Sequence, residues 1–154
     1  MSRTLKDVIA AGADDAVALT APAGVPLTFG ALRALAASAV ATLNAIGIGR
    51  NDRVAIVLPN GPEMATAFLS IAAGTTSAPL NPAYRTEEFE FYLSDLGARA
   101  LVVETGSTSP AIDVARRLGV RVVELRPSPQ RGAGSFELHD TTEASVSPAA
   151  QGGF

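Results

Sequence analysis

Short apolar runs alternate with longer amphipathic segments along this chain. The run from Val54 to Leu58, closed by Pro59, has the length and composition of a buried strand. Similar runs predict further strands at residues 77–80, 101–104 and 121–125. Two shorter strands, joined by a Pro-Ala-Gly turn, are predicted at residues 16–20 and 25–27.

Four of the intervening segments have the apolar spacing of helices. The segment from Thr28 to Ile46 predicts a strong amphipathic helix that covers one face of a sheet. The segment from Glu63 to Ala73 is apolar nearly all round, so its helix must be covered on most sides, and Gly74 is expected to end it.

The other two helices have recognisable start or stop signals. Thr86 is expected to be an N-cap, with Glu87 and Glu88 in the first turn, where carboxylates interact favourably with the helix dipole. The buried stripe of this helix is expected to be Phe89, Tyr92, Leu93 and Leu96. The last helix is predicted from about Pro110 to Leu118, before Gly119.

Strands that alternate with helices predict right-handed parallel βαβ units. The expected fold is therefore α/β, a layered and mostly parallel sheet flanked by helices. From Arg126 the composition shifts to Pro, Gly, Ser, Thr and Ala. We therefore predict an α/β subdomain over residues 1–125 and a linker-like tail over residues 126–154, with one short strand at 136–138.

Composition excludes several classes of function. With 154 residues and 47% apolar residues, the chain can bury the core of one domain. The net charge of −3 and the lack of a basic cluster argue against nucleic acid as a partner. No cysteine is present for a disulfide or a thiolate metal site. No secretory signal and no run of roughly 20 apolar residues is found, so no transmembrane segment is expected and the predicted compartment is the cytoplasm.

Three motifs occur in a characteristic order. They are Leu-Thr-Phe-Gly-Ala-Leu at residues 27–32, Leu-Ser-Ile-Ala-Ala-Gly at 69–74, and Ala-Pro-Leu-Asn-Pro at 78–82, continued by Tyr-Arg-Thr-Glu-Glu at 84–88. Over about residues 5–140 the chain resembles the N-terminal part of the AMP-forming acyl-CoA synthetases, a superfamily that includes luciferases and peptide-synthetase adenylation domains. The segment that begins at Pro79 is most similar to ligases of oxalate and other small carboxylates, and next to fatty-acid ligases.

This resemblance implies an enzyme that activates a carboxylate with ATP and Mg²⁺ and transfers the acyl group to coenzyme A. That chemistry requires a hydroxyl- and glycine-rich loop with a lysine around the phosphates. The local candidates are Thr105–Ser109, which lacks a lysine, and Arg131–Gly134, which lacks a following helix; both are read as turns. No catalytic residue and no metal ligand is therefore assigned, and the chain alone is expected to bind no cofactor.

Three further candidates are given structural interpretations. Gly47-Ile48-Gly49 ends a helix and does not follow a strand, so a turn is favoured over a dinucleotide loop. His139, the sole histidine, is expected to be a solvated loop residue, because a metal site needs several converging ligands. The acidic residues from Glu87 to Glu90 are explained by their place at a helix start.

One loop remains a candidate for binding. Asn81, Tyr84 and Arg85 follow the carboxyl end of a strand, where α/β proteins tend to place ligand contacts. We predict a substrate-binding or interdomain role for these three residues. The alternatives are that Arg85 pairs with Glu88 and that the loop is simply a packed turn.

The resulting hypothesis is the N-terminal fragment of an acid–CoA ligase that supplies scaffold and a docking face to the remaining portion of the enzyme. An isolated fragment should then expose an apolar surface, through which it could also self-associate. The first alternative is a stand-alone, non-catalytic α/β module that binds a protein partner or a small acid. The second alternative is a small nucleotide-binding α/β protein of another family. The absence of a phosphate-binding loop with a lysine counts against it.

Overall fold

The structure, a computed structural model, describes residues 4–141. The helices in this part of the chain are α1 (Leu5–Ala10), α2 (Phe29–Ala45), α3 (Pro62–Ala72), α4 (Thr86–Leu96), α5 (Ala111–Arg117) and the 3-10 turn η1 (Pro129–Arg131). The strands are β1 (Val17–Leu19), β2 (Leu27–Thr28), β3 (Arg53–Val57), β4 (Thr76–Pro79), β5 (Ala100–Glu104), β6 (Arg121–Pro127) and β7 (Phe136–Asp140).

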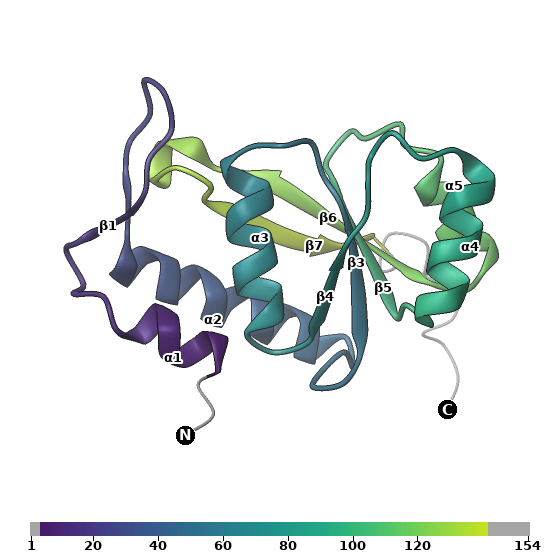
Figure 1. Cartoon of the computed structure of the whole chain (residues 1–154), viewed down its shortest axis with the longest axis horizontal. Helices are drawn as coiled ribbons and strands as arrows, with labels where there is room; N and C mark the ends of the chain where they lie inside the picture. Colours follow the sequence, from purple (N-terminus) through teal and green to yellow (C-terminus); the bar gives the residue numbers. More distant parts are fainter. Residues whose placement is uncertain (1–3, 142–154) are drawn as a thin grey trace, which may run out of the picture.

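The main sheet has the order β4-β3-β5-β6-β7. The first four strands are parallel, and β7 runs antiparallel to β6. Figure 1 shows the sheet between two helical layers, with α2 and α3 on one side and α4 and α5 on the other. The α/β prediction is thus confirmed. The short strands β1 and β2 form a separate antiparallel pair.

Consecutive residues of the central strands pack into different cores. Val54 and Ile56 of β3 lie in the core beneath α2 and α3, whereas Ala55 and Val57 lie in the core beneath α4 and α5. Because side chains alternate between the two faces, a strand covered on both must be apolar at every position. This explains why the strands appear in the sequence as continuous apolar runs.

Helices α2 and α3 pack closely side by side. Gly74, just after α3, permits this approach, because a Cβ atom there would lie 2.7 Å from Cγ1 of Val40 on α2. The predicted covering of α3 is incomplete on one side: Ala67 and Ile71 are buried, while Phe68 is 39% exposed. The glycine therefore serves helix packing as well as helix termination.

The helix α1, which the hydrophobic pattern does not predict, is held to α2 by one arginine. Nη1 of Arg33 donates to the carbonyl oxygens of Ile9 and Gly12, both at 2.8 Å. Nη2 of the same side chain pairs with Asp14. The guanidinium group thereby binds carbonyl groups at the end of α1 that have no partner within the helix.

Residues 126–141 complete the sheet: 126–127 end β6, 136–140 form β7, and a turn joins the two strands. The boundary predicted after residue 125 falls within β6, and the predicted strand at 136–138 extends to Asp140. Between them, the Ala133 N–H donates to the Val25 carbonyl oxygen at 2.7 Å, and Oγ1 of Thr66 donates to the Gly134 carbonyl oxygen at 2.6 Å. The Gly- and Ser-rich composition of 126–141 therefore marks a tightly packed turn and not a linker. The rest of the predicted tail, 142–154, lies outside the described residues.

Replacing Ser70 with alanine is expected to raise the free energy of unfolding by about 1 kcal/mol, because the buried Ser70 hydroxyl has no hydrogen-bond partner among residues 4–141. Thr66, one turn earlier on α3, is also buried but donates to Gly134. Thr66→Val should therefore lower the free energy of unfolding by about 1–3 kcal/mol. Urea denaturation of both variants measures the two signs, and destabilisation by Ser70→Ala would contradict the first.

Candidate functional site

The candidate site lies at the carboxyl ends of the parallel strands. Since β4, β3 and β5 are neighbours and parallel, the segments that follow them emerge at one edge of the sheet. These segments are 58–61, 80–85 and 105–110. The predicted loop, 80–85, is therefore where ligands bind in many α/β proteins.

Asn81 is exposed and forms a local turn. Its Oδ1 atom accepts a hydrogen bond from the Ala83 N–H at 2.9 Å, and its carbonyl oxygen accepts one from the Tyr84 N–H at 3.1 Å. An Asx turn of this kind fixes the loop without help from a ligand. The remaining hydrogen-bonding capacity of the amide is open to solvent.

Tyr84 anchors the loop to α4. Its ring stacks on that of Tyr92, with centroids 5.0 Å apart and planes at 11°, and meets Phe89 edge to face at 5.8 Å. Tyr84 also packs against the core beneath α4 and α5. The side chain predicted to contact a substrate is thus used in part for packing, and it holds its neighbour Arg85 in place.

Arg85 is the N-cap residue of α4, a position that the sequence had suggested for Thr86. The Arg85 carbonyl oxygen accepts from the Phe89 N–H at 3.0 Å, and no side chain caps the helix. The alternative, a pairing with Glu88, is not found: within residues 4–141 the exposed guanidinium group forms no ion pair. It is therefore available to a carboxylate or a phosphate. Glu87 and Glu88 lie in the first turn, as predicted.

The other sequence candidates are structural in the part of the chain that is described. In the loop after β5, the Ser107 hydroxyl accepts a hydrogen bond from the Ser109 N–H, and the Ser109 hydroxyl accepts one from the N–H of Ala111 at the start of α5, as in an ordinary turn. Gly134 packs against α3 with no room for a phosphate. Residues 4–141 contain no cluster of three or more metal-ligating side chains. Nor does any helix in these residues have the length and apolarity needed to cross a membrane.

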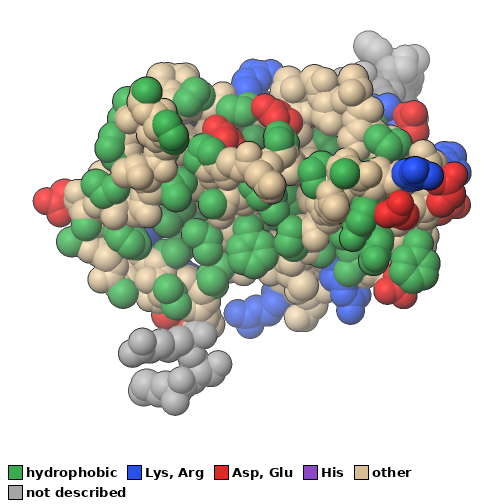
Figure 2. All heavy atoms as spheres, turned by 45° about the horizontal axis from the view of Figure 1, so that its top comes forward, with side chains coloured by type: hydrophobic (Ala, Val, Ile, Leu, Met, Phe, Trp, Pro, Cys, Tyr) green, Lys and Arg blue, Asp and Glu red, His purple; other side chains and the backbone are tan. Residues whose placement is uncertain are grey.

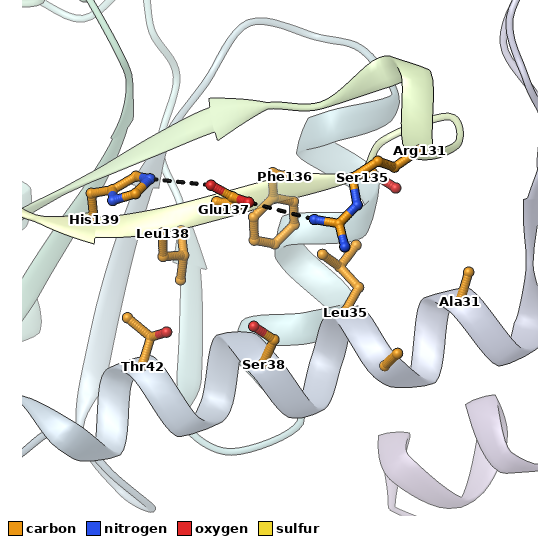
Figure 3. A pocket seen from close by; sticks show the side chains of 11 residues that line it. Ala31, Leu35, Ser38, Thr42, Arg131, Ser135, Phe136, Glu137, Leu138 and His139 are labelled. Atoms are coloured by element: carbon orange, nitrogen blue, oxygen red, sulfur yellow. Dashed lines mark hydrogen bonds and ion pairs between the residues drawn. The ribbon is translucent and has the colours of Figure 1, made fainter.

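A groove between α2 and β7 was not anticipated. It has a volume of about 470 Å³ and is lined by the α2 residues Ala31, Ala34, Leu35, Ser38 and Thr42 and by residues 131 and 135–139. Figure 3 shows Arg131 and His139 on either side of Glu137, at distances of 3.4 and 3.5 Å. His139 was expected in a solvated loop but lies within β7. About a hundred residues separate the two walls, so no local motif could have indicated the groove.

Tyr84 should titrate above the usual range for tyrosine. A hydrogen bond with the Tyr92 side chain, followed by desolvation, raises the pKa of Tyr84 above 10. Because the folded-state pKa is raised, this contribution to stability is complete below pH 10 and is lost as the pH rises through the folded-state value. Tyr92→Phe leaves Tyr84 as the only tyrosine and should return its pKa toward 10. Ultraviolet titration measures this directly, and an unchanged midpoint would exclude Tyr92 as the cause.

Comparison with known proteins gives a consistent family. The profile of the AMP-binding enzymes matches residues 7–150. Over 75 residues the chain is 44% identical to an oxalate–CoA ligase of Arabidopsis thaliana, which covers 48% of this chain and 15% of the ligase. It is 34% identical over 93 residues to the long-chain-fatty-acid–CoA ligase FadD13 of Mycobacterium tuberculosis, covering 60% of this chain and 18% of that enzyme.

The solved structures agree with this result. The crystal structure of apo MatB from Rhodopseudomonas palustris superimposes with a TM-score of 0.70 at 25% identity, over 85% of this chain and 26% of that chain. The described residues thus have the fold of one part of this longer protein. The chain spans only 15% to 26% of the length of these three relatives.

Proposed function

The chain belongs to the family of AMP-binding enzymes, and from this premise we propose that it is the N-terminal fragment of an ATP-dependent acid–CoA ligase. The reaction of the whole enzyme converts a carboxylate, ATP and coenzyme A to acyl-CoA, AMP and diphosphate. The family match over residues 7–150 carries the proposal. The relatives that are named oxalate–CoA ligase and long-chain-fatty-acid–CoA ligase support an acid substrate of one of these two kinds. We place the enzyme in the cytoplasm.

The fragment acts as a scaffold and is not catalytic alone. ATP, Mg²⁺ and coenzyme A are the cofactors of the whole enzyme, but the described residues do not fit them. Residues 4–141 contain no metal-ligating cluster, and the glycines of the turn at 132–134 are packed against Leu27, Pro62 and Thr66. No chemical step is therefore assigned to these residues.

Within the whole enzyme, Arg85 and its loop face the substrate or the next subdomain. The observation that supports this role is the exposed guanidinium group, which is positioned by the stacked Tyr84 and forms no ion pair within the described chain. Asn81 contributes the turn that fixes the loop. A chimera in which residues 5–140 replace the equivalent segment of the Arabidopsis oxalate–CoA ligase tests the role.

The folded chimera should release diphosphate with ATP, coenzyme A and an acid, and Arg85→Ala should lower that rate at least about tenfold if the loop touches the reacting groups. Arg50→Ala is the matched control, because Arg50 is exposed and precedes β3 at the opposite edge of the sheet. The 154-residue chain alone should release none. A folded chimera without activity would favour the alternative, a non-catalytic module that binds a protein partner or a small acid through the same α/β scaffold.

The remaining portion of the enzyme is the proposed partner of the exposed apolar side chains. Phe68 on α3 and Phe91 on α4 are 39% and 62% exposed. Figure 2 shows hydrophobic side chains spread across one face, with charged side chains gathered toward the end formed by α4 and α5. Contiguous exposed apolar patches mark interaction surfaces, so we propose Phe68 and Phe91 as two separate contact points for that portion.

Phe68→Ser and Phe91→Ser should therefore each reduce the binding of a hydrophobic dye to the isolated chain. Phe91→Ser should do so with little change in the free energy of unfolding, because Phe91 is 62% exposed. Dye fluorescence and light scattering measure the effect. An isolated chain that binds no dye would count against these two side chains as docking points.

A further inference from the structure

Within residues 4–141, the outer edge of strand β7 is unpaired. The strand pairs with β6 on one side, and no other strand of residues 4–141 pairs with it. In an antiparallel ladder, alternate residues direct both backbone groups toward the neighbouring strand, and the residues between them direct theirs away. The residues of β7 whose backbone groups point outward therefore decide what the free edge can bind.

Two hydrogen bonds identify those residues. The Ser128 N–H donates to the Ser135 carbonyl oxygen at 2.7 Å, so the paired positions continue in steps of two, to Glu137 and His139. The Leu125 carbonyl oxygen, opposite Leu138, accepts instead from the Thr105 N–H on the β5 side, at 2.9 Å. Leu138 thus directs its N–H and C=O groups to the free edge.

The side chains around Leu138 are self-complementary. Glu137 and His139 flank it, at 3.5 Å from each other. If a second β7 pairs antiparallel across a two-fold axis through Leu138, each Glu137 lies directly opposite the His139 of the other copy. A carboxylate opposite an imidazole can accept a hydrogen bond from it, whereas two carboxylates opposite each other repel and oppose pairing.

The groove beside β7 can accept the second strand. Leu138 packs toward the core beneath α2 and α3, so a Leu138 paired with it from a second copy would project to the same face, next to α2. That position is the groove of about 470 Å³, where α2 presents the small side chains of Ala34, Ser38 and Thr42. Figure 3 shows Ser38 and Thr42 directed toward β7, with open space between the helix and the strand.

We propose that two copies of this chain associate through β7, antiparallel about Leu138, and join their sheets into one continuous sheet. The interface is isologous, with the Leu138 backbone groups paired at its centre and the Glu137 and His139 side chains paired on either side. This surface is distinct from the exposed aromatic side chains of α3 and α4, and the association does not depend on the proposed ligase function.

Hydrogen exchange of the 154-residue chain gives a direct test. The Leu138 amide should exchange rapidly at low protein concentration and become protected as concentration rises, whereas the Glu137 and His139 amides should be protected throughout. Sedimentation should show a monomer–dimer equilibrium over the same range. A chain that remains monomeric at the highest concentration, or a Leu138 amide protected equally at all concentrations, would overturn the proposal.

Charge variants test the register. His139→Glu places carboxylates opposite carboxylates at two symmetric positions and should raise the dimer dissociation constant at least about tenfold. The double variant Glu137→Lys/His139→Glu places a lysine opposite each new carboxylate and should restore dimerisation. Both side chains are about half exposed, so the variants should fold, which far-ultraviolet circular dichroism verifies. Phe91→Ser is the control and should dimerise normally; loss of the dimer in this control but not in His139→Glu would assign association to the aromatic surface instead.

Discussion

Gly134→Ala is expected to lower the free energy of unfolding by about 3–5 kcal/mol, because it combines backbone strain with an overpacked contact. Gly134 has φ +78°, and a Cβ atom there would lie 2.6 Å from Cγ2 of Thr66 and 2.7 Å from the Pro62 carbonyl oxygen. Both contacts are with the first turns of α3, which cannot move without disturbing the core. The change would also displace the carbonyl group that accepts from Thr66.

Gly106→Ala is the matched control for this prediction. Gly106 has a similar φ of +80°, but a Cβ atom there would meet nothing within 4 Å. Only the strain of the left-handed conformation should remain, at about 1–2 kcal/mol. Chemical denaturation of both variants separates the two causes. Equal losses would mean that the turn at 132–134 relaxes away from α3, contrary to the packing described.

Phe89→Ala is expected to lower the free energy of unfolding by about 3–5 kcal/mol, the range for removing a buried aromatic side chain. Phe89 is 0% exposed in the core beneath α4 and α5. It also supports Tyr84 edge to face. The variant should therefore loosen the candidate loop as well, which would appear as faster amide exchange at Tyr84 and Arg85.

Phe91→Ala, two residues along the same helix, provides the comparison. Phe91 is 62% exposed and touches Tyr92 edge to face at 5.2 Å. Its removal should change the free energy of unfolding by no more than about 0.5 kcal/mol. A large loss in this variant would show that the outer face of α4 is packed in solution, for instance against another molecule.

The central strands could be predicted because a strand that is buried on both faces is apolar at every position, and the main helices could be predicted from the spacing of their apolar residues. The run at Val54–Leu58 is apolar at every position and forms β3, displaced by one residue. The family resemblance is confirmed by the match over residues 7–150. By contrast, α1 is only six residues long and buries only Ile9, so its pattern is too short to read.

The turn at 132–134 shows why composition alone does not predict the structure of residues 126–141. Glycine and serine are typical of linkers, but here glycine is required by positive φ at Gly132 and Gly134, and Ser135 is buried. Only the contacts of this turn with α3 and with residues 25–27 show that it is packed and is not a linker. No local pattern contains those partners.

The position of the candidate loop could be predicted, but its internal arrangement could not. A loop after a strand must reach the carboxyl edge of a parallel sheet, so Asn81, Tyr84 and Arg85 lie there by topology. The stacking of Tyr84 on Tyr92 depends on how the loop enters α4, which begins one residue earlier than the Thr86 cap would require. A substrate-binding or interdomain role for these three residues stays a prediction.

The way in which α1 is attached to α2 determines how easily this helix can detach from the fold. Helix α1 buries only the Ile9 side chain. Its hydrogen bonds to the rest of the described fold come from Arg33, which donates to the carbonyl oxygens of Ile9 and Gly12. A segment secured at so few points can detach while the sheet stays intact. We therefore expect α1 to be the first site of limited proteolysis within residues 4–141, cleaved at a rate that Arg33→Met would increase without changing the cleavage of α2 or α3.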